Sequence, residues 1–126
     1  MIGQNMEAHT ERLIERGLLF DYYGGLLNEK NKRIYEAAAV EDMSLTEISE
    51  EMGISRQAVS DSLKRIDTKL QGYEKELALI KKSRILEDCA GEIRDVLYGA
   101  DPEKAGLLTG SDIARIEDIL TRIEEL

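Results

Sequence analysis

The segment from residue 55 to residue 65 concentrates side chains that could recognise nucleic acid. An arginine can donate two hydrogen bonds to guanine, a glutamine can pair with adenine, and serine can contact either base. Serine hydroxyls and basic side chains also bind phosphate oxygens, which positions a protein on a duplex without reading its sequence. The candidate contact residues are Ser55, Arg56, Gln57, Ser60, Lys64 and Arg65.

Two short helices separated by a glycine would present these side chains. Ser44 and Glu47 form the sequence of a capping box, which begins a helix. Gly53 ends that helix because glycine adopts a left-handed backbone at little cost, and Ser55 is a favoured N-cap for the next. Residues 45–63 therefore predict a helix-turn-helix, whose second helix would enter the major groove of DNA. Its expected interior residues are Ser49, where the helices cross, and Ile48, Ile54, Val59 and Leu63.

A second interpretation of this motif stays open. Helix-turn-helix geometry also serves as a packing or protein-docking unit. Asp61 would lie on the exposed side of the second helix, where its carboxylate would repel phosphate.

Residues suited to catalysis or metal binding are sparse. His9 is the single histidine and lies in an N-terminal segment that we expect to be frayed. Cys89 lies on an apolar stripe and is expected to be a small core residue. The sequence has no Cys/His cluster, glycine-rich phosphate loop or calcium loop. We therefore expect a protein that is not an enzyme, with no cofactor and no metal.

The composition of the 126 residues favours an all-α fold. Ala, Glu, Lys, Leu and Arg supply roughly half of the chain, whereas there are three Val, one Phe and no Trp to build a sheet. The net charge of −9 repels nucleic acid at long range. Residues 55–84 are the positive stretch, with eight basic and four acidic side chains.

The apolar spacing predicts further helices around the motif. A first helix spans about residues 10–23, with Ile14, Leu18 and Tyr22 on one stripe, and a second begins after the N-cap Asn28. Apolar repeats resume from Leu86 and again from Ile113, so a helical hairpin is expected around a loop at 99–111. We expect residues 1–70 to form the helix-turn-helix domain, and residues 71–126 a helical extension and hairpin that serve dimerisation or packing.

A heptad pattern continues the second helix of the motif well beyond its turn. Apolar residues recur at 59, 63, 66, 70, 73, 77 and 80, with Gly72 as a weak point and a boundary expected near 81–84. This seam could pack within the chain or against a second copy. We favour a homodimer, with Ile66 to Ile80 left for the partner.

Cellular location is expected to be the cytoplasm. No stretch of ~18 apolar residues is present, the N-terminus has no secretory pattern, and a single Cys cannot form an internal disulfide. We expect a soluble protein without a membrane partner.

Two resemblances follow from these motifs. Residues 27–30, 44–50, 53–55 and 59–63 resemble the promoter-reading C-terminal region of bacterial sigma factors. Residues 19–23, 55–59, 64–65 and 70–77 resemble the YlxM family, small bacterial helix-turn-helix proteins encoded beside the signal recognition particle genes. The resemblance covers about residues 10–80.

The resemblance implies a DNA-binding regulator with a sigma-like fold and a long recognition helix, taking part in the signal recognition particle pathway. The alternative is an accessory protein that does not bind DNA and docks on the protein or RNA of that particle. Double-stranded DNA is thus one expected partner, and the particle's protein or RNA is the other.

Overall fold

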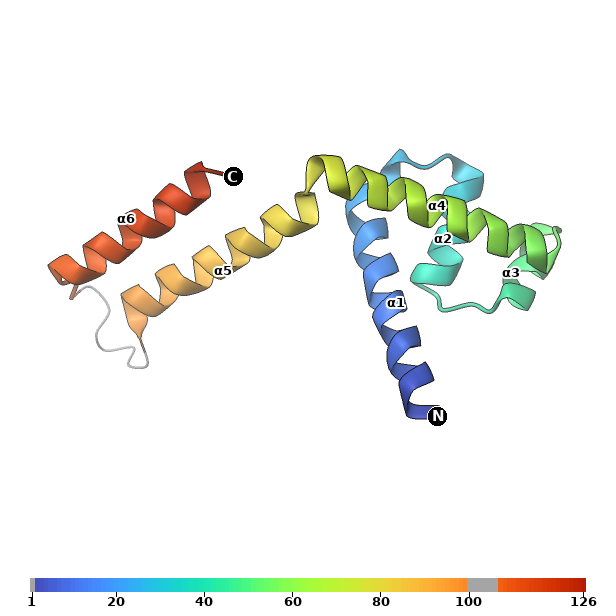
Figure 1. Cartoon of the computed structure of the whole chain (residues 1–126), viewed down its shortest axis with the longest axis horizontal. Helices are drawn as coiled ribbons and strands as arrows, with labels where there is room; N and C mark the ends of the chain where they lie inside the picture. Colours follow the sequence, from blue (N-terminus) through green and yellow to red (C-terminus); the bar gives the residue numbers. More distant parts are fainter. Residues whose placement is uncertain (1, 100–106) are drawn as a thin grey trace. The chain divides into compact units, whose positions relative to one another are not determined.

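The structure is a computed structural model that describes residues 2–99 and 107–126, in which helices and no strands are found (Figure 1). The predicted all-α fold is therefore confirmed. The chain divides into two compact units, residues 1–80 and 81–126. Part of the loop expected at 99–111, residues 100–106, lies outside the described residues. The elements are α1 (Ile2–Tyr23), η1 (Gly24–Leu26), α2 (Glu29–Ala39), α3 (Leu45–Met52), α4 (Arg56–Leu77), α5 (Leu79–Tyr98) and α6 (Gly110–Glu124).

Local capping signals begin and end the helices of the first unit as predicted. The side chain of Asn28 accepts a hydrogen bond at the start of α2, and Ser44 and Glu47 form the reciprocal capping box of α3. Gly53 ends α3 with a φ of 66°, in the left-handed region, and Ser55 caps α4. These contacts satisfy backbone N–H groups that a helix leaves without partners.

The core of the first unit lies between α1, α2, α3 and α4. The stripe expected on α1 is wrong at two positions: Ile14 is 59% exposed and Tyr22 is 40% exposed, whereas Leu18 packs against the core. Leu19 and Tyr23 are buried instead. Apolar side chains occur on several faces of α1, and the packing of α2 and α4 selects the face that is buried. The other buried core residues include Ile34, Tyr35, Ala37, Ile48, Val59, Leu63, Ile66 and Leu70.

The heptad seam of α4 is used within the chain itself. Ile66 and Leu70 are buried in the core of the first unit, and Ile80 is 9% exposed. The expectation that Ile66 to Ile80 remain free for a partner is therefore wrong, because packing against α1 and α2 occupies most of this stripe. Leu77, which is 46% exposed, is the exception.

The helix α4 runs uninterrupted through Gly72 and ends at Ala78, whose φ is 53°. This break precedes the boundary expected at 81–84. Tyr23 explains the position, because its hydroxyl donates to Glu74 (2.5 Å) and accepts from the N–H of Leu79 (3.1 Å). Glu74 also accepts from the N–H of Ile80 (3.0 Å). Residues from α1 and α4 thus cap the first turn of α5.

The second unit contains the expected helical hairpin, in which α6 runs back alongside α5 (Figure 1). Thr109 and Asp112 form a capping box at the start of α6. Cys89 and Ile119 are buried, which agrees with the core role expected for Cys89. An ion pair joins Glu92 on α5 to Arg122 on α6.

Candidate nucleic-acid interface

The first turns of α4 carry the side chains that the sequence placed at a nucleic-acid interface. Arg56 and Gln57 are exposed, and so are Lys64 and Arg65 two turns later, whereas Ser60 is half-buried. The helix-turn-helix thus leaves these polar groups accessible while Val59 and Leu63 are buried on the opposite side. A shallow surface hollow is lined by Leu45, Ser55, Arg56, Gln57 and Ser60.

The candidate side chains differ in the contacts that they already make. The Ser55 hydroxyl accepts from the N–H of Ala58 (3.0 Å), so its hydrogen stays free to donate to a phosphate. Gln57 donates through Nε2 to Asp61 (2.9 Å), and Arg65 donates to the hydroxyl of Ser62 (3.1 Å). Four of the six candidates therefore remain without a side-chain acceptor of their own.

Two cations on this surface are especially available. Within residues 2–99 and 107–126, neither Arg56 nor Lys64 has an ion-pair partner. Asp61 is exposed on the same helix, one turn before Lys64. The surface therefore combines free positive charge with one carboxylate.

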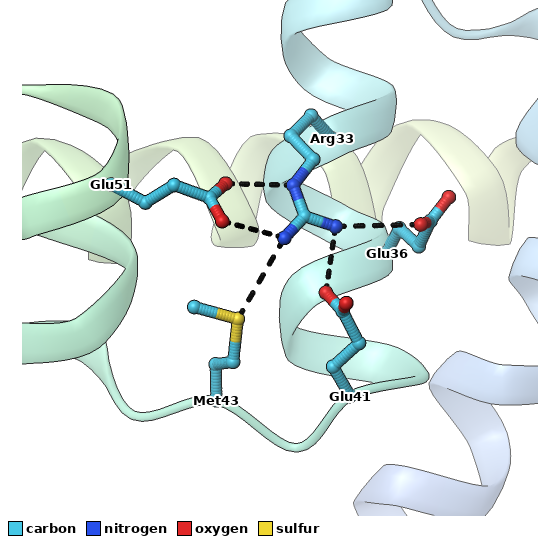
Figure 2. Close-up of polar contacts among 5 residues, drawn as sticks. All are labelled: Arg33, Glu36, Glu41, Met43 and Glu51. Carbon is cyan, nitrogen blue, oxygen red and sulfur yellow. Dashed lines mark hydrogen bonds and ion pairs between the residues drawn. The ribbon is translucent and has the colours of Figure 1, made fainter.

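The helix α3 is fixed to α2 by Arg33, whose guanidinium is surrounded by acceptors (Figure 2). Its Nε and Nη2 atoms each lie 2.7 Å from an oxygen of Glu51, at the C-terminal end of α3. Its Nη1 atom donates to Glu41 (2.6 Å) and Glu36 (3.4 Å), and Nη2 lies 3.9 Å from the sulfur of Met43. The bidentate geometry fixes orientation as well as distance.

This cluster changes the titration of its members. The hydrogen bonds from Arg33 lower the pKa of Glu51 below its usual value of 4.5. The same bond to Glu51, together with that to Glu41, raises the pKa of Arg33. Both groups therefore stay charged across the neutral pH range. The ion pair thus holds α3 against α2, and α3 in turn packs against α4.

The helix α4 is held by a second polar cluster around Asp67. Arg16 on α1 donates through Nη2 (2.8 Å) and Nε (3.1 Å), and the Tyr35 hydroxyl on α2 donates to the same carboxylate (2.8 Å). Burial, followed by the hydrogen bond to Asp67, raises the pKa of Tyr35. Burial opposes the charge of Arg16, but the bond and attraction to Asp67 outweigh it and raise the pKa of Arg16.

Sequence reasoning missed both clusters, although it identified the surface that they support. Asp67 directly follows the buried Ile66. A carboxylate next to an apolar stripe could have indicated a polar contact at the edge of the core. Arg33 offered a partial signal, because Glu36 follows it by three residues on α2, whereas Glu41 lies after that helix and Glu51 lies on α3.

The residues considered for catalysis or metal binding belong to other elements, His9 to α1 and Cys89 to α5. His9 belongs to α1, and its Nε2 lies 3.2 Å from Asp42, so the frayed segment expected there is wrong at this position. Among the described residues, no His, Cys, Asp and Glu cluster could hold a metal ion. In the same part of the chain, no helix is long and apolar enough to cross a membrane.

Comparison with known proteins places this geometry in context. Residues 10–106 match the model of the UPF0122 family, described as "Putative helix-turn-helix protein, YlxM / p13 like". The UPF0122 protein of Thermoanaerobacter sp. (strain X514) is 37% identical over 109 residues, 86% of this chain and 85% of that protein. The UPF0122 protein YlxM of Bacillus subtilis (strain 168) is 35% identical over 94 residues, 75% of this chain and 86% of that protein.

Proposed function

Because the chain belongs to the UPF0122 family of YlxM / p13-like helix-turn-helix proteins, we propose that it is a non-enzymatic regulator that binds double-stranded DNA. The observation that carries this proposal is the pair of unpartnered cations, Arg56 and Lys64, on the exposed side of a helix that α3 braces. In this fold, the N-terminal turns of the second helix are the ones that enter the major groove.

Each candidate residue has a distinct role in this proposal. Arg56 reads guanine, and Gln57 reads adenine after releasing Asp61. Ser55 and Lys64 bind phosphate oxygens, together with Arg65, and Ser60 contacts a base or the backbone within the hollow beside Arg56. Because few phosphates are neutralised and the chain carries a charge of −9, binding is weak and sensitive to salt.

Fluorescence anisotropy with a labelled mixed-sequence duplex tests the proposal. Binding is expected at low salt, with log Kd rising linearly with log salt. Lys64→Ala is expected to weaken binding to all sequences alike and to reduce the salt slope by about 1. Arg56→Ala is expected to relax the sequence preference of duplexes selected from a random pool.

Lys75→Ala is the matched control, because Lys75 is exposed on the same helix and its loss changes the net charge equally. Lys75 follows Lys64 by three helical turns and is expected to leave the affinity within about twofold. Absence of binding at low salt, or equal losses in the Lys64 and Lys75 variants, would contradict the proposal.

The alternative is an accessory protein that docks on the protein or RNA of the signal recognition particle. Asp61 favours docking on the particle's protein, because this exposed carboxylate, which holds the amide of Gln57, would repel the phosphates of RNA as it would those of DNA. The same titration with the particle's RNA and its protein separates the two functions. Asp61→Asn is expected to strengthen duplex binding, whereas a partner with a basic surface would bind this variant more weakly.

A further inference from the structure

The hairpin of α5 and α6 buries few of its own side chains. Among the described residues of the second unit, Cys89 and Ile119 are the buried ones. A unit as short as residues 81–126 buries a small share of its surface on folding and is marginally stable alone, and two helices do not enclose a core. The remaining apolar side chains of the hairpin therefore require a further surface.

Eight of these apolar side chains lie on one side of the hairpin. Successive residues of an α-helix are about 100° apart around its axis. Measured in this direction, the apolar side chains of this set on α5 lie roughly 40–100° from Cys89, and those on α6 lie roughly 40–120° from Ile119. Because α5 and α6 run in opposite directions (Figure 1), the same rotation on each helix points to the same side of the pair. We name this side the apolar face; it consists of Leu86, Ala90, Ile93 and Leu97 on α5 and Ile113, Ile116, Leu120 and Ile123 on α6.

Exposure supports this assignment. Leu86 is 45% exposed, Ile113 is 50% exposed and Leu120 is 46% exposed. Glu92 is rotated the other way from Cys89, and Arg122 the other way from Ile119. Their ion pair therefore lies on the other side of the hairpin. The hairpin is thus polar on one side and apolar on the other, as a helix pair is when one side is covered.

Charges at the edges of the apolar face bear on a second copy of the same face. Arg94 lies at the α5 edge, with Glu87 two turns before it and beyond the level of the α6 end, and Glu117 and Glu124 lie at the α6 edge. The ion pair shows that Glu92 and Arg122 lie at the same height along the two helix axes. Counting from this pair, Arg94 lies at a height between those of Glu117 and Glu124. A copy related by a half-turn about an axis parallel to the helices places its α6 antiparallel against α5. Each Arg94 then faces Glu117 and Glu124 of the other copy.

We propose that the apolar face binds the same face of a second copy, which forms an antiparallel four-helix bundle and makes the protein a homodimer. A four-helix bundle encloses a core between its facing helices, and a two-fold interface uses the same residues on both chains. This inference stands apart from DNA binding, since the surface on α4 is not part of it.

Analytical ultracentrifugation of the full chain tests the dimer. The wild type is expected to sediment as a reversible dimer, and Leu120→Glu to raise the dimer Kd by about 100-fold, because both copies would bury a carboxylate. Thr121→Glu is the matched control: the residue is exposed on the same helix, and its side chain contacts the carbonyl of Glu117 in its own helix. It is expected to leave the Kd within about twofold.

A charge exchange tests the arrangement of the two copies. Arg94→Glu is expected to raise the Kd by about tenfold, and adding Glu117→Arg and Glu124→Arg to recover most of that loss. Circular dichroism of each variant confirms that the helices are retained. A wild type that stays monomeric at about 100 µM would overturn the proposal. The apolar face would then be covered by the first unit of the same chain or by another protein. Equal Kd values for Leu120→Glu and Thr121→Glu would overturn it as well.

Discussion

Replacing Asp67 by Asn is expected to destabilise the first unit strongly. Asp67 accepts hydrogen bonds from Tyr35 and from two nitrogens of Arg16, and the Arg16 and Asp67 side chains are 21% and 22% exposed. The asparagine amide keeps one acceptor oxygen but replaces the other with a donor group, so the Arg16 guanidinium would lose a hydrogen bond and the negative charge of its partner.

The magnitude follows from burial. Breaking a fully buried ion pair costs about 3–5 kcal/mol, whereas a surface pair contributes about 0–1 kcal/mol. Because about a fifth of each side chain reaches water, we expect the free energy of unfolding to fall by about 2–4 kcal/mol. For a unit of this size, such a loss lowers Tm by roughly 10–20 °C.

Urea unfolding followed by circular dichroism measures this effect. Asp21→Asn is the matched control, because Asp21 is exposed on α1 and undergoes the same chemical change. It is expected to alter the free energy of unfolding by less than about 0.5 kcal/mol. If Asp67→Asn costs less than about 1 kcal/mol, the cluster is no stronger than a surface ion pair and the reasoning is wrong.

Four further outcomes are expected from unfolding measurements on single variants. The raised pKa of Tyr35 means that its contribution to stability is present below pH 10 and lost above it, so Tyr35→Phe should reduce the alkaline loss seen in a pH series. The lowered pKa of Glu51 means that its contribution is present above about pH 4.5 and lost as pH falls, so Glu51→Gln should flatten the acid side of the same series. Gly53→Ala should cost about 1–2 kcal/mol in urea unfolding, because a Cβ is strained at its φ of 66°. Ala78→Gly should instead raise Tm, by relieving about 1 kcal/mol at a φ of 53°; an unchanged Tm would show no strain there.

The local part of this fold could be predicted from sequence. Ser44, Gly53 and Ser55 act on neighbouring backbone groups, so their residue types alone were sufficient to define the helix ends and the turn. The exposure of Arg56 and Lys64 followed from the same motif. Local chemistry therefore predicted the candidate surface.

Features set by distant segments were not predictable in this way. Spacing alone did not distinguish a dimer seam from a core stripe, and the structure places Ile66 and Leu70 in the core. The end of α4 at Ala78 depends on Tyr23, which lies far away in sequence and caps the next helix. The use of the α4 seam and the end of α4 both depend on contacts between segments far apart in the sequence. The spacing of apolar residues within one helix carries no information about such contacts.

The alanines of α2 give the Asp67 cluster a role beyond stability. Ala37, Ala38 and Ala39 are buried, and Gly17 on α1 lies against the backbone of Ala39. Small side chains let helices approach closely but supply few ridges that fix one helix along another. A directional carboxylate shared by three helices selects one register, as single buried polar residues do in coiled coils. Loss of Asp67 would leave the polar contacts between α1 and α4 at Tyr23–Glu74 and Glu15–Gln71, toward the C-terminal half of α4. The N-terminal turns that we propose to bind DNA would then be positioned less firmly.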